Sequence, residues 1–376
     1  MKVAIVHYWL VGMRGGEKVV SELCELYPEA DIFTLVADRD KLSETINKHK
    51  ITTSFLQKIG GKKHYQKFLP LMPHALEGFD LTDYDLVISS EAGPAKGIVT
   101  RPDAVHICYC HSPMRYIWDL EPQYRSAAGT LARVVLRLTG PYLRQWDVTT
   151  SARVDHFIAN SEYVASRIRK YYRRSSTVIN PPVSLERFSP RSDVGDFYLC
   201  AGQITPYKKI ELAIEAFTRS GKPLEIIGAG VTPQMQKMAG PNVKFLGAVS
   251  DEVMADKFAC CKALIFPGVE DFGIVPLEVM ASGRPVIAFA RGGAMETVLD
   301  GVTGLLFHEQ SSAALAEAVD RFERGAVRGS PEDFRRHVEK FGRSIFREKM
   351  RRFIDGALNA ASNEPRRPIL DVVAGE

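Results

Sequence analysis

The sequence predicts an α/β protein with two doubly wound domains, each built on a parallel sheet that helices cover on both faces. The chain has 376 residues, which is more than one hydrophobic core usually holds. Short apolar runs rich in β-branched residues alternate with helical patterns, as is typical of parallel sheets. This alternation stops at Pro181-Pro182 and then begins again, which indicates a second domain.

The expected strands fall into two groups. Before the proline pair, apolar runs predict strands at residues 3–8, 31–36, 85–89, 105–110 and 156–159. After it, they predict strands at 197–201, 224–227, 243–246, 263–266, 286–289 and 305–307. Because the two prolines exclude a helix and stiffen the chain, we place the boundary between Pro181 and Pro190.

Composition and charge exclude several classes of protein. Apolar residues make up 45% and charged residues 25%, an ordinary globular profile, and the net charge of +4 does not indicate a nucleic-acid partner. No apolar run approaches the ~20 residues of a membrane span, and the N-terminus lacks a signal cleavage site. We therefore expect a cytoplasmic protein.

One segment suggests contact with a membrane. In residues 131–138, Arg133 and Arg137 stand one helical turn apart beside Leu131, Val134, Val135 and Leu138. Such an amphipathic helix could lie on anionic lipid at the inner face of the plasma membrane. It is equally typical of an ordinary surface helix.

The six cysteines show no CxxC spacing and are expected to be reduced. The run His106-Ile-Cys-Tyr-Cys-His111 holds four metal-binding side chains. In a strand, however, His106, Cys108 and Cys110 point one way and His111 the other, so one ion cannot gather all four. We expect no metal site and no cofactor.

Ligands of parallel sheets collect where strands end and helices begin. The first such loop contains Gly15 and Gly16 and predicts either close approach to a ligand or a simple tight turn, since the GxGxxG fingerprint is absent. The second follows residues 105–110 with His111, then Ser112 as an expected N-cap and Pro113 at the first helical position. His111 could bind a ligand hydroxyl or be structural.

The third and fourth loops carry charge. Gly202 is followed by Lys208 and Lys209 at a helix start, where a cation gains nothing from the dipole and an anion such as a diphosphate would compensate. In the fourth, Glu270 and Glu278 flank a glycine-containing loop with free amides. Two carboxylates beside such amides favour recognition of sugar and ribose hydroxyls together with a phosphate.

On these residues the chain resembles the retaining glycosyltransferases of the GT-B fold, family 4. The resemblance covers nearly the whole chain and is carried by Glu270 and Glu278 within EDFGIVPLE, by GGEKV at 15–19, and by the His111 and Lys208 loops in order. The stretches HICYCHSPMRYIWD and AGQITPYKKIELAIEAF resemble bacterial mannosyltransferases of O-antigen and exopolysaccharide assembly. The resemblance implies two Rossmann-like domains facing across a cleft and a GDP-mannose donor.

The resemblance also implies roles for individual residues. Glu278 would hold the ribose, Glu270 the hydroxyls of the transferred hexose, and Lys208 the diphosphate; His111 would touch the sugar. With Glu270, Lys208 and His111 as catalytic residues, the remaining donor contacts are Gly15, Gly16, Gly202, Gln203, Lys209, Asp271, Phe272, Gly273, Ile274 and Val275. The acceptor contacts are Lys96, Arg115 and Tyr116.

Two departures from the family pattern stand out. Many relatives carry Arg where this chain has Gln203, for which Lys209 could substitute, and Glu91-Ala-Gly-Pro replaces a histidine-containing run on the acceptor side. We expect an N-terminal acceptor domain of residues 1–184 and a donor domain of residues 185–345. A helix at 346–362 is expected to return to the first domain, and residues 363–376 to form a flexible tail.

The expected reaction is metal-independent transfer of a hexose, with retention, to a glycan or polyprenyl-diphosphate-linked glycan acceptor. Two other functions fit the same architecture. A sugar-nucleotide epimerase also grips a diphosphate between two α/β domains but needs no acceptor sugar. A non-catalytic two-lobed binding protein would release no nucleoside diphosphate.

Overall fold

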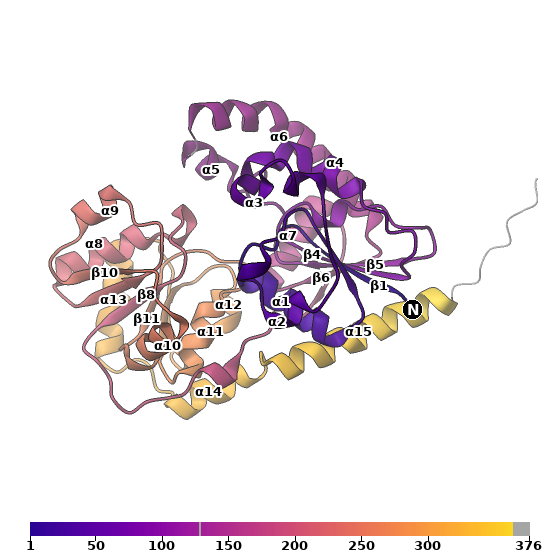
Figure 1. The fold of residues 1–376 in the computed structure, drawn as a ribbon. Coiled ribbons are helices and arrows are strands. Elements are labelled where there is room, and N and C mark those ends of the chain that lie inside the picture. The colour runs from indigo at the N-terminus through magenta and orange to yellow at the C-terminus, as the bar shows by residue number, and fades with distance from the viewer. Residues whose placement is uncertain (128, 364–376) are drawn as a thin grey trace, which may run out of the picture.

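The computed structural model describes residues 1–127 and 129–363 and divides them between two parallel sheets (Figure 1). The first sheet has seven strands in the order β3-β2-β1-β4-β5-β6-β7, and the second has six in the order β10-β9-β8-β11-β12-β13. We call the part built on the first sheet, with helix α15, the N-lobe and the part built on the second sheet the C-lobe. The predicted α/β class with two doubly wound units is confirmed.

The N-lobe strands are nearly all buried because helices cover both faces of the sheet. In sheet order they are β3 (Ile51–Thr53), β2 (Asp31–Thr34), β1 (Val3–His7), β4 (Leu86–Glu91), β5 (Val105–Cys110), β6 (His156–Ala159) and β7 (Thr177–Val178). The helices are α1 (Gly15–Leu26), α2 (Glu44–Asn47), α3 (Gly61–His64), α4 (Met72–Glu77), α5 (Glu121–Ala127), α6 (Thr130–Thr150) and α7 (Glu162–Tyr172).

The C-lobe repeats this plan with shorter loops. Its strands are β10 (Val243–Gly247), β9 (Leu224–Ile227), β8 (Tyr198–Ala201), β11 (Leu264–Phe266), β12 (Val286–Phe289) and β13 (Gly304–Phe307). Its helices are α8 (Ile210–Ser220), α9 (Pro233–Met238), α10 (Asp251–Cys260), α11 (Ile274–Ala281), α12 (Ala294–Thr297), α13 (Ser312–Glu323) and α14 (Pro331–Glu339).

All eleven predicted strands are present, with ends shifted by two residues or fewer. The two strands that the sequence did not predict, β3 and β7, are edge strands of three and two residues. Neither is long enough to show the alternation on which sequence prediction depends. Most of the sheet is central and buried, so its strands read clearly as apolar runs.

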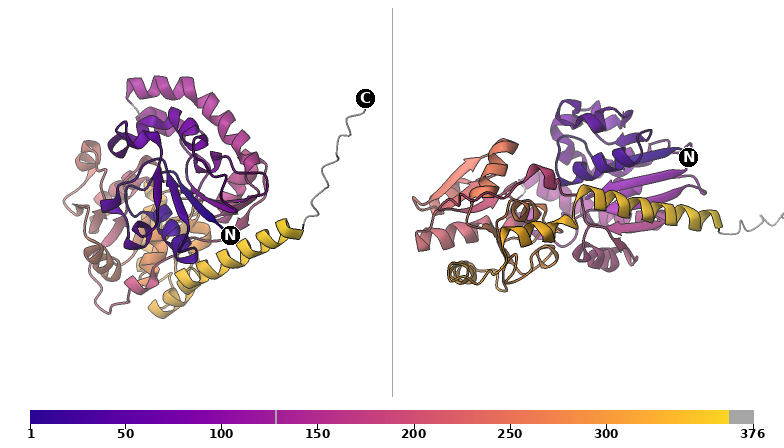
Figure 2. Two further views of the ribbon diagram at one scale, coloured as in Figure 1. Left: turned by 45° about the vertical axis from the view of Figure 1, so that its right-hand side comes forward. Right: turned by 90° about the horizontal axis from the view of Figure 1, so that it is seen from below.

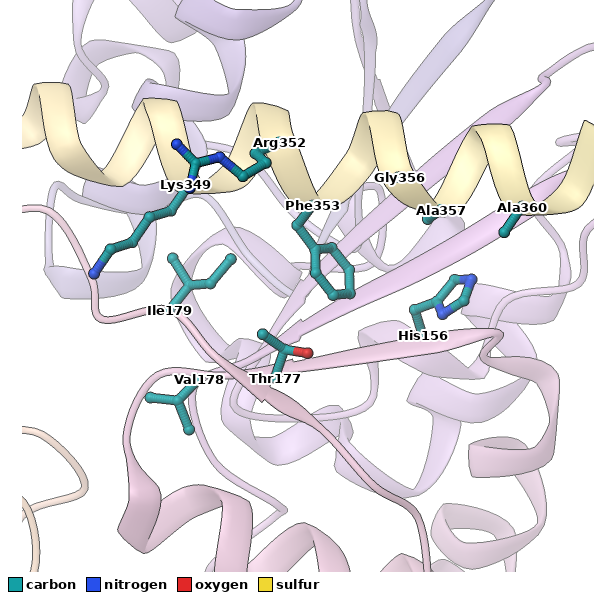
Figure 3. A pocket seen from close by; sticks show the side chains of 10 residues that line it. All are labelled: His156, Thr177, Val178, Ile179, Lys349, Arg352, Phe353, Gly356, Ala357 and Ala360. Carbon is teal, nitrogen blue, oxygen red and sulfur yellow. The ribbon is translucent and has the colours of Figure 1, made fainter.

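Helix α15 (Arg343–Asn363) leaves the C-lobe and packs along the N-lobe (Figures 1 and 2). Its Phe346, Met350 and Ile354 are buried in the same core cluster as β1 and β5. The helix begins before residue 346, and the expected tail from 364 onward lies outside the described residues. The boundary between 184 and 185 stays a prediction. Within residues 1–127 and 129–363, no helix is long and apolar enough to cross a bilayer.

Candidate active site

The four glycine-containing or charged loops all follow strand ends, after β1, β5, β8 and β11, and the first of them lies beside the second and the fourth. A Cβ added at Gly15 would lie 3.1 Å from Ile274 Cδ1, and one added at Gly16 would lie 3.6 Å from His111 Nε2. Across the lobes, Lys18 Nζ lies 3.0 Å from Glu278 Oε1. The predicted donor residues of the two lobes therefore meet at one place.

The start of α1 is tightly packed, which explains its glycines. A Cβ at Gly16 would stand 3.2 Å from the His7 ring and 3.3 Å from the Tyr8 hydroxyl, closer than most real Cβ contacts. The Arg14 amide donates to Glu17 Oε2 at 3.1 Å, which caps the helix. Only a residue without a side chain lets the helix begin this close to β1.

His111 is a neutral side chain at the end of β5. Its Nε2 lies 2.9 Å from Ser90 Oγ, and burial lowers its pKa to about 3. The expected helix after it does not form, because the Ser112 hydroxyl donates to the Pro113 carbonyl and accepts from Arg167 Nη1. Ser112 as N-cap is therefore wrong, and residues 111–120 form turns.

The Lys208 loop holds its cation against Glu270. Lys208 ends a short 3₁₀ turn, Pro206–Lys208, and its Nζ lies 2.9 Å from Glu270 Oε1. Burial by itself lowers the pKa of Lys208, but the Glu270 carboxylate raises it above the ordinary value, so the lysine is charged. Gly202 has φ +109°, and a Cβ there would approach this Nζ to 2.7 Å.

The same loop contains two more residues predicted to bind the donor, Lys209 and Gln203. Lys209 adopts a left-handed conformation with φ 53° at the N-terminal boundary of α8, which turns the chain between the 3₁₀ turn and the helix. Gln203 is exposed. In the part of the chain that the structure describes, neither forms a hydrogen bond or ion pair with the two glutamates, so their predicted phosphate contacts stay predictions.

The fourth loop contributes Glu270 and Glu278 in different ways. Glu278 is largely buried on α11 and pairs with Lys18 of the N-lobe, whereas Glu270 sits in the loop and pairs with Lys208 of its own lobe. Phe272 is buried in the C-lobe core, so only its backbone could face a sugar. Gly273 has φ +86° and starts α11, followed by the partly buried Ile274 and Val275.

Asp271 uses its carboxylate in contacts between the lobes, which leaves its backbone for the predicted contact with the sugar; that contact stays a prediction. The carboxylate binds two N-lobe guanidinium groups: Arg115, and Arg167 Nη1 at 2.8 Å. Its backbone carbonyl accepts from Ser161 Oγ at 2.6 Å. The guanidinium of Arg115 also lies 5.0 Å from the Tyr207 ring of the Lys208 loop. Arg115 therefore joins the two C-lobe loops instead of standing free for an acceptor.

Lys96 was predicted to contact the acceptor, and the structure contradicts this. Its side chain is fully buried on the 3₁₀ turn Ala95–Gly97, where Nζ contacts Asp147 and lies 3.7 Å from Glu91 Oε1. Burial lowers the pKa of Lys96, but the two carboxylates raise it further than burial lowers it. The lysine stabilises the fold and no acceptor can reach it.

Tyr116, the third residue predicted to contact the acceptor, lies beside Gly93. Its hydroxyl is buried and has no hydrogen-bond partner among the described residues, and a Cβ at Gly93 would lie 3.5 Å from it. The same added Cβ would lie 3.7 Å from the Tyr8 side chain. Both tyrosines therefore lie beside Gly93. Tyr8 directly follows β1, and Gly93 follows β4.

Sequence reasoning missed several residues that join the lobes. Lys18 belongs to the quoted GGEKV run but received no role, although it pairs with Glu278. At the start of α7, the amides of Glu162 and Tyr163 donate to Glu296 of the C-lobe at 2.9 and 3.1 Å. A serine before an apolar helical run signals the N-cap Ser161, but nothing in the sequence indicates that Glu296 meets it. In the described part of the chain, no group of three His, Cys, Asp or Glu side chains could hold a metal ion.

Comparison with known proteins agrees with this arrangement. The family model for Glycosyltransferase Family 4 matches residues 13–187, and that for Glycosyl transferases group 1 matches residues 184–343. The O-antigen chain mannosyltransferase C of Escherichia coli is 28% identical over 319 residues, covering 77% of this chain and 78% of that protein. The alpha-1,3/1,6-mannosyltransferase ALG2 of Candida glabrata is 23% identical over 446 residues, covering 96% and 94%.

Similarity to other proteins is partial or limited to the fold. The match to a D-inositol 3-phosphate glycosyltransferase of Streptomyces avermitilis spans about half the length of each chain. The crystal structure of Anabaena Alr3699/HepE with UDP-glucose superposes with a TM-score of 0.68 at 16% identity, covering 95% of this chain and all of that one. That likeness establishes the GT-B fold for the two lobes.

Proposed function

This chain belongs to the glycosyltransferases described by the family 4 and group 1 models, and from that premise we propose that it transfers mannose from GDP-mannose to a glycan acceptor. The choice of mannose is supported by the relatives that are named mannosyltransferases. The use of a nucleotide sugar is supported by the UDP-glucose bound to a protein of the same fold. We further propose that the acceptor is a lipid-linked glycan of bacterial surface polysaccharide synthesis.

The observation that carries the proposal is the pair of ion pairs at the junction of the lobes. Glu270 and Glu278 are 18% and 11% exposed and are bound by Lys208 and Lys18. Ion pairs that keep some access to solvent can exchange one partner for a ligand. The diphosphate of a sugar nucleotide is an anion that can pair with Lys208 in place of Glu270. The ribose and hexose hydroxyls of the same molecule can donate hydrogen bonds to the two carboxylates.

In the proposed complex, Glu278 accepts from the ribose hydroxyls and Glu270 from the hexose hydroxyls, while Lys208 binds the diphosphate. Lys208 then stabilises negative charge that grows on the leaving phosphate, as preorganised cations do elsewhere. The acceptor hydroxyl attacks from the face that the diphosphate leaves, and the leaving phosphate takes its proton. No nucleophile from the protein is required, and the anomeric configuration is retained.

The donor is tested by thermal shift and by turnover. A ligand that binds only the folded chain raises its melting temperature, so GDP and GDP-mannose should raise it more than UDP and UDP-glucose at equal concentration. Release of GDP should depend on an added acceptor, which distinguishes transfer from epimerisation. Proton NMR of the first product should show the same anomeric configuration as the donor. A larger shift with UDP, or release of GDP that an added acceptor does not accelerate, would overturn the assignment.

Metal independence is a separate part of the proposal. Lysine supplies the charge that a divalent ion supplies in other transferases, so activity should survive EDTA. The assay compares initial rates with EDTA and with added manganese. Loss of activity in EDTA that manganese restores would contradict this part and leave the donor assignment untouched.

A further inference from the structure

Two segments of the N-lobe contain no acidic residue. Residues 45–76, between Glu44 and Glu77, carry six lysines, and residues 122–146, between Glu121 and Asp147, carry four arginines. The whole chain has a net charge of +4, so the remainder of the sequence carries −6. Positive charge is thus concentrated in about one seventh of the chain.

The same two segments hold large apolar side chains that the fold leaves exposed. Of the sixteen such side chains among the described residues, eight lie here. Leu138 is 74% exposed, Tyr142 54%, Val134 51% and Ile59 51%. Exposed apolar side chains are individually ordinary, but a group of them in one region marks an interaction surface.

Both segments lie on the same face of the N-lobe sheet. The inner sides of α4 and α6 share one core cluster, which contains Met72 and Leu76 from α4 and Leu143 and Trp146 from α6. Figures 1 and 2 show α3, α4, α5 and α6 gathered at the end of the N-lobe, with α6 arching over it. The elements that carry the exposed cations and apolar side chains therefore lie on the same side of the N-lobe.

We propose that this surface docks on an anionic lipid bilayer. We call it the docking face; it is formed by Lys58, Ile59, Lys63, Lys67 and Leu71 from the first segment and Arg133, Val134, Arg137, Leu138 and Tyr142 from the second. Cations at the level of anionic headgroups and apolar side chains just below them are how amphipathic surfaces bind membranes. Three acids beside these segments are already paired, Asp38 with Lys62, Glu77 with Arg153 and Glu121 with Arg125, so they add little repulsion.

The apolar side chains favour lipid over nucleic acid as the partner. A nucleic acid would engage the cations through its phosphates but offers no apolar volume for Leu138, Val134 or Ile59. A bilayer takes both kinds of side chain. Docking would also place the transfer site near a lipid-linked acceptor, and this last step alone rests on the proposed function.

Vesicle flotation tests the docking face without any substrate. The full-length protein should float with vesicles of phosphatidylcholine and 30% phosphatidylglycerol, and not with phosphatidylcholine alone. Reversing two charges in Lys63→Glu/Arg137→Glu should weaken partitioning at least about thirtyfold, since each basic residue near such a surface contributes about fivefold. Leu138→Ser should weaken it as well, because this exposed side chain would enter the apolar part of the bilayer.

The matched control reverses two exposed cations of the C-lobe, Lys237→Glu/Lys244→Glu, which should leave flotation unchanged. Turnover of a water-soluble acceptor by Lys63→Glu/Arg137→Glu should match wild type, showing that the variant is folded. Equal flotation of the two double variants would overturn the proposal. The proposal would also be overturned if the protein did not float with vesicles but bound a DNA duplex, and if the same charge reversals weakened that binding.

A second observation points to how the acceptor is held. Three half-buried rings form a row from the transfer site toward the docking face: Tyr8 and Trp9 lie 4.3 Å apart, and Trp9 and Tyr65 lie 4.7 Å apart. Tyr8 stands beside Gly16 and its hydroxyl near His111, while Tyr65 begins the 3₁₀ turn Tyr65–Leu71 of the first acid-free segment. We infer that this row binds acceptor sugars, whose apolar C–H faces pack on aromatic rings. This inference rests on the proposed function.

The ring row is tested by comparing variants that keep or lose a ring. Trp9→Ala and Tyr65→Ala should raise the KM for acceptor about tenfold, while Trp9→Phe and Tyr65→Phe change it less than threefold. The KM for donor and the slow hydrolysis of donor in water should stay unchanged in all four. Unchanged acceptor KM in both alanine variants would overturn the inference, whereas absence of any donor turnover in wild type would overturn the proposed function instead.

Discussion

Both lobes pair a lysine with carboxylate, one group at Lys208 and two at Lys96, but the two sites differ in burial. In the C-lobe, Lys208 and Glu270 are 11% and 18% exposed and lie 2.9 Å apart. In the N-lobe, Lys96, Glu91 and Asp147 are completely buried and also bind the Tyr172 hydroxyl and the Trp118 indole. The first arrangement can open to admit a ligand, whereas the second cannot open without unfolding its surroundings.

This difference explains why the family resemblance misassigned Lys96. From the sequence, both lysines follow a strand and a glycine-containing loop, and both were predicted to bind substrate. The structure separates them by access to solvent: a lysine that meets substrate keeps a path to it, and a lysine that fixes a fold does not. The predictions below test that separation, starting with the largest expected effect.

Lys96→Met should destabilise the fold by about 3–5 kcal/mol, the usual cost of breaking a buried charge cluster. Removing the cation leaves two carboxylates facing one another, and burial already raises the pKa of Glu91 to about 7. The measurement is denaturant unfolding, with the exposed Lys237→Met as control. If the variant had normal stability and a raised KM for acceptor, Lys96 would contact the acceptor as first predicted. The two lysines would then not differ in the way that their burial indicates.

Lys208→Ala should lower kcat a hundredfold or more, because one preorganised contact to a developing anion is worth about 2.7–4 kcal/mol. Its effect on unfolding should be much smaller than that of Lys96→Met, since the remaining Glu270 can be hydrated. Steady-state kinetics and denaturant unfolding of the same preparation measure both. Wild-type turnover would remove Lys208 from the mechanism.

Asp271→Asn should lower transfer about tenfold and increase the share of donor lost to hydrolysis. The change removes the carboxylate shared by Arg115 and Arg167, so two like charges face each other at the contact between the lobes. A looser contact admits water to the donor. The ratio of free mannose to transferred mannose measures this; the exposed Asp251→Asn is the control. An unchanged ratio with a normal rate would show that the cluster is not needed at the contact.

The sequence predicted the fold well and singled out the loop of Glu270 and Glu278, because both depend on local patterns. Central strands appear as apolar runs, and Glu270 and Glu278 stand eight positions apart within one loop and helix. Contacts between distant segments leave no such pattern. Arg167 reaches Asp271 across 104 positions, and Lys18 reaches Glu278 across 260. The contacts that join the lobes could therefore be found only in three dimensions.

The smallest expected effect concerns the pH dependence of His111. Burial lowers the pKa of both His111 and His7 to about 3, so neither is charged between pH 5.5 and 8 in the folded chain. The unfolded chain binds these protons near pH 6.5, so both histidines reduce stability as the pH falls from 6.5 toward 3.

For catalysis the neutral ring can only donate or accept a hydrogen bond. The pH profiles of kcat/KM for wild type and His111→Asn should therefore have the same shape from pH 5.5 to 8, even if the variant is slower. An inflection near pH 6.5 in the wild-type profile that disappears in His111→Asn would show that the ring is open to solvent. The difference between fully buried groups and groups that a ligand can reach would then not extend to His111.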